Sequence, residues 1–460
     1  MSPDEFRRAG YDVVDWIANY LANIRDYPVL PDKAPGTLVD SLPISGPELG
    51  EPIDRILEDF RNLIVPNVTH WNHPRFHAYF SVSASAPGIL GEMLTAALNI
   101  NGMLWKSSPA TTELEQTTMS WLRQWMGLPD SFFGLIYDTA SISTMHAIAA
   151  AREAAFPEVR TDGGLRDATV YCSEQAHSSV EKGAITLGIG QKNVRKVPVD
   201  AEFRMRIDAF EALLEQDLRD GKRPFCVVAS VGTTSTTSVD QVPKVVEIAR
   251  KQGVWVHVDG AFGASAAVAP EFRHLLDGSE DADSIVVNPH KWLFTPIDIS
   301  VLFTRRPEIL RRAFSLIPEY LKTAEDPRAV NFMDYGVQLG RRFRALKFWF
   351  VMRYFGRERM AEIIRSHVKW AQEFSEWVRR DERFEVVAPV PLSLVCFRLK
   401  AGDEANRRLM DELNETGKVF LSHTVLNGNF VLRLAIGNIK TSREDIAGAW
   451  ELIREIAGTI

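Results

Sequence analysis

Four short apolar runs in the middle of the chain constrain its fold more than any other sequence feature. They cover residues 168–172, 225–230, 254–258 and 284–287, and helical stretches such as 242–252 lie between them. The runs do not alternate apolar and polar residues, so both faces of each strand should be buried. Parallel sheets covered by helices on both sides have strands of this kind. The segment from about 85 to 310 therefore predicts an α/β domain with a mostly parallel central sheet.

The sequence before this domain predicts a helical arm. Residues 4–24 place apolar side chains at helical spacing, which predicts an amphipathic helix. Four prolines between residues 28 and 43 then favour an extended segment with too little apolar content to fold on itself. We expect this arm, residues 1–84, to be a dimerisation segment that is buried against a second copy of the chain.

The sequence after the central domain changes character. Residues 384–399 and 419–436 are β-rich, and Asn427-Gly428-Asn429 predicts a hairpin turn between two strands. Residues 442–456 predict a helix with Ser442 as its N-cap. We therefore expect three domains, namely the arm (1–84), a large α/β domain (85–370) and a small C-terminal α+β domain (371–460).

The composition limits the compartment and the partners. The chain is 45% hydrophobic and 25% charged, and neither a 20-residue apolar run nor an N-terminal signal pattern is visible. The net charge of −7 and the lack of a basic stripe argue against nucleic acid. Cys172, Cys226 and Cys396 form no C-x-x-C pair, and we expect Cys172 and Cys226, which lie in apolar runs, to be buried, unreactive thiols. We predict a soluble cytoplasmic protein with no membrane partner.

A hydroxyl-rich turn at residues 136–144 predicts a phosphate site. It reads Ile-Tyr-Asp-Thr-Ala-Ser-Ile-Ser-Thr and leads into a helical stretch at 145–153. The first N–H groups of a helix have no acceptor within it, so hydroxyls beside them favour an anion. Taken alone, the turn also fits a plain helix cap.

Three further motifs follow predicted strands, at the sheet edge where α/β proteins bind ligands. Asp259 ends the strand in Val-His-Val-Asp-Gly-Ala and could keep a pyridine nitrogen protonated. Lys291 follows the strand in Asn-Pro-His-Lys-Trp, where desolvation would lower its pKa and make it a nucleophile. His177 could stack on a planar cofactor. Each residue alone also fits an ordinary structural role, so the combination carries the interpretation.

With these residues the chain resembles the aromatic-L-amino-acid decarboxylases, a group of fold-type I pyridoxal-phosphate enzymes. The resemblance runs essentially from end to end, and the string Asn-Pro-His-Lys-Trp at 288–292 is its most specific part. The other matching segments are residues 6–10, 69–74, 108–115, 175–179, 339–344 and 430–433. The resemblance implies pyridoxal 5′-phosphate as cofactor, an aromatic amino acid as substrate and a homodimer, and it implies no metal.

The resemblance also implies roles for individual residues. Lys291 would attach the cofactor, and Asp259 would pair with the pyridine nitrogen. His177 and Ala261 would lie on opposite faces of the ring. The residues implied around the phosphate are Thr139, Ala140, Ser141, Asn288 and His290, and Thr234 would lie near the ring hydroxyl or the substrate carboxylate. The residues implied to line the substrate pocket are Trp71, Tyr79 and Phe80, although ordinary core packing is the alternative for such aromatics.

Two positions within the phosphate turn depart from the family pattern. Ile142 stands where the family has an acidic residue, and Asp138 stands where it has glycine. A carboxylate next to a phosphate is unfavourable, so we expect Asp138 to point away or to have a partner.

A third departure concerns proton transfer. An ungapped count back from Leu339 places Phe332 where the family has a loop tyrosine that reprotonates the substrate carbon. Phenylalanine has no proton to donate. Tyr335, or His177 through a water, could supply the proton and give an amine. Otherwise oxygen could intercept the carbanion and give an aldehyde, as in the plant aromatic aldehyde synthases. We expect the amine and keep the aldehyde as the alternative.

Other classes of protein fit less well. A nicotinamide dehydrogenase needs a third glycine after Gly188-Ile189-Gly190. His70, His73 and His77 could suggest a metal site, but Pro74 interrupts them and no nearby cysteine or carboxylate completes the set. An aminotransferase could use Arg433 to bind a carboxylate. A protein without catalytic activity would leave four complementary motifs unexplained.

Overall fold

The computed structural model describes residues 1–316 and 329–460, which form two compact units. The larger unit comprises Val82–Ser375 and Ala388–Val395. The smaller unit comprises Met1–Ser81, Glu376–Val387 and Cys396–Ile460. The arm and the C-terminal region thus fall in one unit, and the division into three domains stays a prediction.

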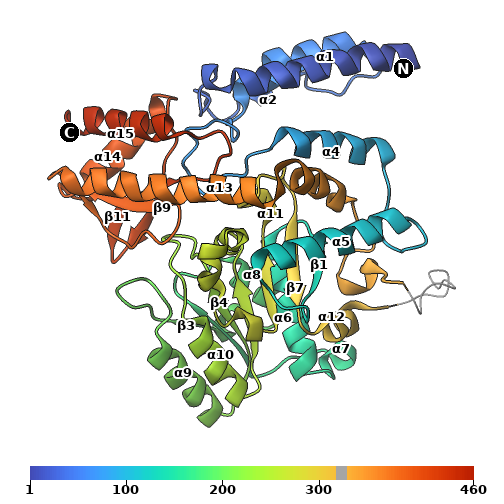
Figure 1. The fold of residues 1–460 in the computed structure, drawn as a ribbon, viewed down its shortest axis with the longest axis vertical. Helices are drawn as coiled ribbons and strands as arrows, with labels where there is room; N and C mark the ends of the chain where they lie inside the picture. Colours follow the sequence, from blue (N-terminus) through green and yellow to red (C-terminus); the bar gives the residue numbers. More distant parts are fainter. Residues whose placement is uncertain (317–328) are drawn as a thin grey trace. The chain divides into compact units, whose positions relative to one another are not determined.

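The larger unit is built on a seven-stranded sheet in the order β1-β7-β6-β5-β4-β2-β3 (Figure 1). Its strands are β1 (Phe133–Tyr137), β2 (Ala168–Ser173), β3 (Val194–Val197), β4 (Arg223–Ser230), β5 (Trp255–Asp259), β6 (Ser284–Val287) and β7 (Ser300–Thr304). The strands from β6 to β3 run parallel, whereas β7 is antiparallel to both of its neighbours. The predicted mostly parallel sheet is confirmed, and β2, β4, β5 and β6 match the four apolar runs.

Helices cover this sheet. The α-helices are α4 (Ala86–Leu98), α5 (Pro109–Met126), α6 (Ala140–Ala155), α7 (Val159–Asp162), α8 (Ser179–Thr186), α9 (Ile207–Arg219), α10 (Val242–Lys251), α11 (Pro289–Trp292), α12 (Pro307–Phe314) and α13 (Arg344–Arg380), and α13 is interrupted at Gly356. The 3₁₀ helices are η4 (Gln191–Asn193), η5 (Gly263–Val268), η6 (Pro270–Leu276), η7 (Ser279–Asp281) and η9 (Phe332–Tyr335). Every residue of β2, β6 and β7 is buried, so these strands are covered on both faces.

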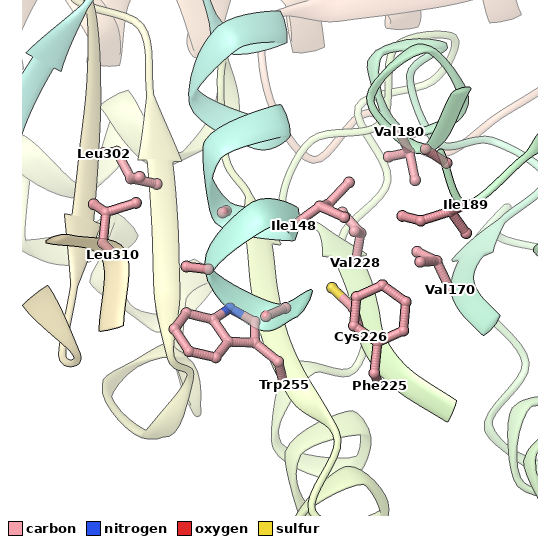
Figure 2. Close-up of a cluster of buried hydrophobic side chains, with 14 of the residues drawn as sticks. Ile148, Val170, Val180, Ile189, Phe225, Cys226, Val228, Trp255, Leu302 and Leu310 are labelled. Carbon is pink, nitrogen blue, oxygen red and sulfur yellow. The ribbon is translucent and has the colours of Figure 1, made fainter. Parts of the chain in front are cut away.

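The hydrophobic core of the larger unit lies between α6 and the sheet. Figure 2 shows Ile148 on α6 beside Val228 of β4, with Cys226 on the same strand and Trp255 on the neighbouring strand β5. All three cysteines are free and buried, as predicted for Cys172 and Cys226, and burial raises their pKa values. The core therefore fixes the position of α6, whose first turn contains the predicted phosphate site.

The smaller unit contains the N-terminal helices and a second sheet. Its helices are α1 (Pro3–Ala22), η1 (Ile24–Asp26), α2 (Thr37–Ser41), α3 (Ile53–Asp59), the π-helix η2 (Phe60–Ile64), η3 (Val65–Asn67), α14 (Asp403–Glu415) and α15 (Arg443–Ala457). The sheet has the order β10-β11-β9-β8 and consists of β8 (Phe384–Val386), β9 (Leu394–Leu399), β10 (Ser422–Leu426) and β11 (Asn429–Ala435). The helix predicted at 4–24 is confirmed, although the arm after it is not wholly extended because α2 forms within it.

Local sequence signals explain two details of this unit. Asn427 and Gly428 both have positive φ (50° and 80°), which a two-residue hairpin between antiparallel strands requires, and the predicted turn is confirmed. Ser442 caps α15 with a reciprocal bond to Asp445, also as predicted. Among the described residues, no helix is long and apolar enough to span a membrane.

Candidate active site

The carboxyl ends of β4, β5 and β6 are fastened to one another by backbone hydrogen bonds. These bonds run from Val231 N–H to Asp259 O (2.8 Å), from Gly260 N–H to Val286 O (3.1 Å) and from Asn288 N–H to Ala261 O (3.0 Å). They hold the loops after three neighbouring strands at one edge of the sheet. This edge is where a parallel sheet binds its ligands.

Asp259 ends β5 with its carboxylate in a fixed direction. Its Oδ1 accepts the N–H of Ala261 at 3.1 Å, and the side chain is half-buried. A Cβ on Gly260 would lie 2.5 Å from the Cβ of Ala264, so only glycine allows this close approach. In this tight turn Oδ1 of Asp259 is bound to the backbone, and Oδ2 can interact with a positively charged group.

Lys291 lies in the short helix α11, directly after β6. Its N–H donates to Asn288 O at 2.9 Å. Burial lowers the pKa of Lys291, and the carboxylate of Asp259 opposes that shift. The amine of Lys291 is therefore more readily neutral than that of a surface lysine, which is the requirement for a nucleophile.

The neighbour of Lys291 anchors this helix. Trp292 is fully buried and stacks on Phe262 with ring centroids 4.5 Å apart. Its indole N–H donates to Nδ1 of His367 at 3.0 Å. Because one face and the polar edge of this indole are in contact with other side chains, the backbone that carries Lys291 has little freedom to move.

His177 follows β2 and responds electrostatically to both residues. The N–H of Ser179 donates to His177 Nδ1 at 3.1 Å, so the hydrogen of the neutral ring is on Nε2. Burial lowers the pKa of His177. The negative charge of Asp259 raises this pKa, and the positive charge of Lys291 lowers it. The structure thus brings His177, Asp259 and Lys291 close enough to interact electrostatically.

The predicted phosphate turn is the first turn of α6. This helix begins at Ala140, five residues before the predicted start, because Thr139 takes the extended conformation of an N-cap. The carbonyl of Thr139 accepts the N–H groups of Ile142 and Ser143, at 3.1 Å and 3.0 Å. The N–H groups of Ala140 and Ser141 have no acceptor within the helix, so they can bind an anion.

Asp138 has partners, as expected for a carboxylate beside a phosphate site. Its Oδ1 accepts both the N–H (2.5 Å) and the hydroxyl (3.1 Å) of Thr139. Its Oδ2 accepts the side-chain amide of Gln338 at 3.3 Å. The carboxylate is therefore held against the turn by three donors.

Asn288 and His290 place buried polar atoms beside Lys291. Asn288 is 2% exposed, and its Oδ1 has no hydrogen-bond partner among the described residues. His290 accepts the N–H of Ile299 at Nδ1 (3.0 Å), and burial lowers its pKa to about 3. The ring is therefore neutral with its hydrogen on Nε2. A buried acceptor without a partner and a neutral donor are what a bound polar ligand would satisfy.

The two other predicted cofactor residues differ in exposure. Thr234 is exposed on the loop between β4 and α10, whereas Ala261 is buried. Sequence reasoning missed a buried network beneath the site, in which His257 Nδ1 lies 2.9 Å from Ser284 Oγ and Nε2 lies 3.4 Å from Thr144 Oγ1. The signal was available, because His257 precedes Asp259 by two strand positions and so lies on the same face.

The predicted substrate residues belong to the smaller unit and form an aromatic cluster. Trp71 stacks on Phe76 with centroids 4.2 Å apart, and Tyr79 lies 6.0 Å from Trp71. Both Trp71 and Tyr79 are exposed at the surface of this unit. The guanidinium of Arg433 lies 5.7 Å from the ring centre of Phe80.

The groups considered for other functions have structural partners within the smaller unit. Arg433 donates to Ser422 Oγ at 2.9 Å. One ring nitrogen of each candidate metal ligand has a partner: Tyr20 for His70, the N–H of Arg75 for His73 and the carbonyl of Ala435 for His77. Among the described residues, no group of three or more histidine, cysteine or acidic side chains could hold a metal ion.

Phe332 and Tyr335 lie in η9 and pack beside β1. Phe332 is 2% exposed, with the guanidinium of Arg341 4.5 Å above its ring centre. The ring of Tyr335 lies 5.3 Å from that of Phe133, and burial raises the pKa of Tyr335. Both side chains therefore belong to the packing of the larger unit, and their part in proton transfer stays a prediction.

Comparisons with known proteins point to one family. Residues 35–400 match the pyridoxal-dependent decarboxylase conserved domain. The chain is 40% identical to an aromatic-L-amino-acid decarboxylase of Catharanthus roseus over 99% of this chain and 94% of that one. It is also 40% identical to a phenylacetaldehyde synthase of Arabidopsis thaliana, over 99% and 96%. A crystal structure of Oryza sativa TDC with PLP and tryptamine has a TM-score of 0.97 and 39% identity, covering 100% of this chain and 99% of that one.

Proposed function

Since the chain belongs to the pyridoxal-dependent decarboxylase family, we propose that it converts an aromatic L-amino acid to its amine and CO₂. The observation that carries this proposal is the shared position of Lys291, Asp259 and His177 at the carboxyl edge of the sheet. The pyridoxal-dependent decarboxylase family uses pyridoxal 5′-phosphate. When bound, this cofactor accepts the electron pair that remains on the substrate as CO₂ leaves.

The described residues fit that cofactor. The amides of Ala140 and Ser141 suit the phosphate, and the unpartnered Oδ1 of Asn288 is a buried acceptor that a ligand donor would satisfy. The carboxylate of Asp259 would hold a proton on a pyridine nitrogen. Lys291 would attach the cofactor through its readily deprotonated Nζ.

The protein residues have distinct tasks in the reaction. Asp259 provides the negative charge that favours a protonated ring. His177 presents a neutral Nε2–H in an orientation fixed by Ser179. Ala261 offers a small apolar surface on the turn after Asp259, and His290 contributes a neutral donor beside Asn288. Together these groups bind and orient without adding a second positive charge near Lys291.

An aromatic substrate is supported by two observations. Relatives at about 40% identity carry names that specify aromatic amino acids. The exposed cluster of Trp71 and Tyr79 offers ring surfaces of the kind that bind aromatic side chains. The experiment is to incubate the purified holoenzyme with phenylalanine, tyrosine, tryptophan, DOPA and glutamate and to measure CO₂ and amine. Glutamate turnover above that of all four aromatic substrates would refute the aromatic assignment.

The protein would act as a homodimer. Its arm exposes large apolar side chains, including Val39 (74%), Ile44 (108%) and Leu49 (84%), and α1 exposes Phe6 (69%). Apolar surface of this extent in one segment favours burial against another chain. Light scattering should give about twice 51.7 kDa, and a stable, active monomer would rule the dimer out.

Aldehyde synthesis is the second candidate because position 332 carries no hydroxyl. Phe332 replaces the loop tyrosine expected from the family, and a phenylacetaldehyde synthase is among the relatives. A positioned general acid contributes about 10²–10⁴-fold to proton transfer, so its loss would give oxygen time to react. The test measures amine, aldehyde, ammonia and peroxide for the wild type, Phe332→Tyr and Tyr335→Phe. Stoichiometric aldehyde and peroxide from the wild type would replace the amine proposal.

A further inference from the structure

A cluster of charged side chains joins the helices α4 and α13 to the loop between α11 and β7. Nζ of Lys347 lies 2.9 Å from Oε2 of Glu92, and Arg342 also pairs with Glu92. Nε of Arg344 lies 2.8 Å from Oδ1 of Asp298 in the loop. Three cations and two carboxylates leave this cluster with one net positive charge.

Lys347 is the most deeply buried member of the cluster. Its side chain is 1% exposed, compared with 28% for Glu92 and 46% for Arg342. Burial lowers the pKa of Lys347, and the carboxylate of Glu92 opposes that shift. Water and salt screen a buried charge less than a surface charge. The field of Lys347 therefore extends further into the protein than that of the exposed arginine.

Two glycines of α4 bring this lysine close to the loop between α11 and β7. A Cβ on Gly91 would lie 2.6 Å from Cα of Lys347, and a Cβ on Gly88 would lie 2.3 Å from Cδ of Pro296. Both distances are too short for a real contact, so only glycine allows these approaches. Because Gly88 and Gly91 are three residues apart, the lysine and the loop pack against the same face of α4.

The same loop leads to the proposed phosphate site. Its Ile299 donates the N–H that His290 accepts, and the Oγ of Ser300 lies 2.8 Å from the Oγ of Ser143 in the first turn of α6. Burial lowers the pKa of His290 to about 3, and the positive charge of Lys347 contributes to lowering it. Lys347 therefore lies within electrostatic reach of the groups that would hold the phosphate.

The phosphate group needs more positive charge than its proposed ligands supply. A phosphate monoester carries about −1.5 to −2 at pH 7, and the start of a helix contributes only about +0.5. Asn288 has no charge, and the low pKa of His290 keeps its ring neutral. The carboxylate of Asp138 lies in the same turn and adds to the negative charge. About two negative charges therefore lack a compensating cation within this set.

We propose that the buried ammonium group of Lys347 strengthens the binding of the cofactor phosphate through its electric field. Glu92 has the opposite effect, because its carboxylate reduces the positive charge of the cluster. The proposal rests on the proposed position of the phosphate at the first turn of α6, and it is independent of the product that the enzyme releases. The two partners of one ion pair should thus affect phosphate binding in opposite directions.

The experiment measures the binding of pyridoxamine 5′-phosphate and of pyridoxamine to the full-length apoprotein by calorimetry. Neither compound has an aldehyde, so neither forms a bond with Lys291, and they differ only in the phosphate. Lys347→Met removes the cation, and Glu92→Gln removes the carboxylate of the same pair. Arg342→Met removes an exposed cation from Glu92, so the sign of the effect can be tested even if Lys347→Met does not fold.

The expected shifts in Kd differ in sign. Lys347→Met should bind pyridoxamine 5′-phosphate about tenfold more weakly, Arg342→Met about twofold more weakly, and Glu92→Gln about threefold more tightly. A tenfold change corresponds to about 1.4 kcal/mol, which Coulomb's law gives for two charges about 12 Å apart at an effective dielectric constant of about 20. The Kd of pyridoxamine should change by less than about twofold in every variant.

An exposed ion pair on α10 is the matched control. Nζ of Lys251 lies 3.3 Å from Oε1 of Glu247, and both side chains are more than half exposed. Lys251→Met and Glu247→Gln change the total charge of the protein by the same amounts as the two main variants. Because water and salt screen exposed charges, neither control should change the Kd of either compound by more than about 1.5-fold.

Three results would overturn the proposal. Weaker binding in both Lys347→Met and Glu92→Gln would show that the ion pair acts by holding the fold and not by its charge. Equal losses for pyridoxamine 5′-phosphate and pyridoxamine would show that the phosphate is not the group affected. Unchanged binding in all three variants would show that the charge of the cluster does not reach the phosphate. A wild type that decarboxylates no amino acid would refute the proposed function instead, and the binding measurements do not depend on turnover.

Discussion

The substitution Asp259→Asn removes the negative charge of the Asp259 side chain and keeps its shape. The Asp259 Oδ1 accepts the N–H of Ala261 at 3.1 Å, and an asparagine Oδ1 can accept the same bond. The turn after β5 should therefore persist while one negative charge disappears. That charge supports the protonated forms of Lys291 and His177, so the pKa of each should fall in the variant.

The expected loss of turnover follows from the exposure of the site. Asp259 is half-buried, so an effective dielectric constant of about 20 is appropriate, and two unit charges about 4 Å apart interact by about 4 kcal/mol. Removal of a preorganised electrostatic partner typically costs a factor of about 10²–10³ in kcat. We expect Asp259→Asn to lose activity within that range when the cofactor is bound.

The assay pairs turnover with the reactivity of the apoprotein. Labelling of Lys291 by an amine-reactive reagent should become faster in Asp259→Asn, because a lower pKa gives more neutral amine at a given pH. The exposed Lys192 is the internal reference. An unfolded variant would instead label all lysines faster. Turnover within about threefold of the wild type, or slower labelling of Lys291, would refute the electrostatic role.

Three further predictions concern the attachment site, the core and acid stability. Borohydride treatment of the holoenzyme should fix the label on one peptide that contains Lys291, and label on another lysine would refute the attachment site. Glu115→Leu should destabilise the fold by about 3–5 kcal/mol in urea titrations, because Glu115 is 2% exposed and accepts Arg341 at 2.7 Å. The exposed Gln116→Ala is its control, and a loss below about 1 kcal/mol would contradict the argument. Burial lowers the pKa of His290 to about 3, and it lowers the pKa of four other histidines to about 4, namely His73, His77, His146 and His257. As the pH falls, these histidines take up protons in the unfolded state before they do so in the folded state. The free energy of unfolding therefore decreases below about pH 6.5, by roughly 1.4 kcal/mol per histidine at pH 5.5. An unchanged urea midpoint between pH 7.5 and 5.5 would contradict this.

The central strands could be predicted from the sequence because burial on both faces requires a continuous run of apolar residues. Residues 284–287 are all apolar except Ser284, and the observed strand has the predicted bounds. The edge strand β3 has no such apolar run, because Arg195 and Lys196 occupy its middle and are only half-buried. The antiparallel direction of β7 is set by pairing with β6 and β1, which a single sequence does not display.

The candidate site was predictable where it lies on strand ends and less so where it depends on pairing across the fold. Asp259 and Lys291 follow apolar runs, so their common edge follows from the parallel arrangement. The tautomer of His290 depends on Ile299, nine residues away, and the N–H of Val337 donates to His146, far earlier in the chain. Such contacts arise only when separate elements pack together.

The burial of Phe332 changes what a tyrosine at this position would mean. Phe332 packs at 2% exposure beneath the guanidinium of Arg341, so a hydroxyl added there would enter a filled core. A buried hydroxyl without a partner costs about 1–3 kcal/mol, and that cost should appear in the stability of Phe332→Tyr. If Phe332→Tyr changes the product and also loses stability, the new hydroxyl acts from a conformation other than this packed one. If it changes the product at no cost in stability, the hydroxyl has found a partner within the fold. The product assay therefore needs a urea titration of the same variant, because product alone cannot distinguish these two mechanisms.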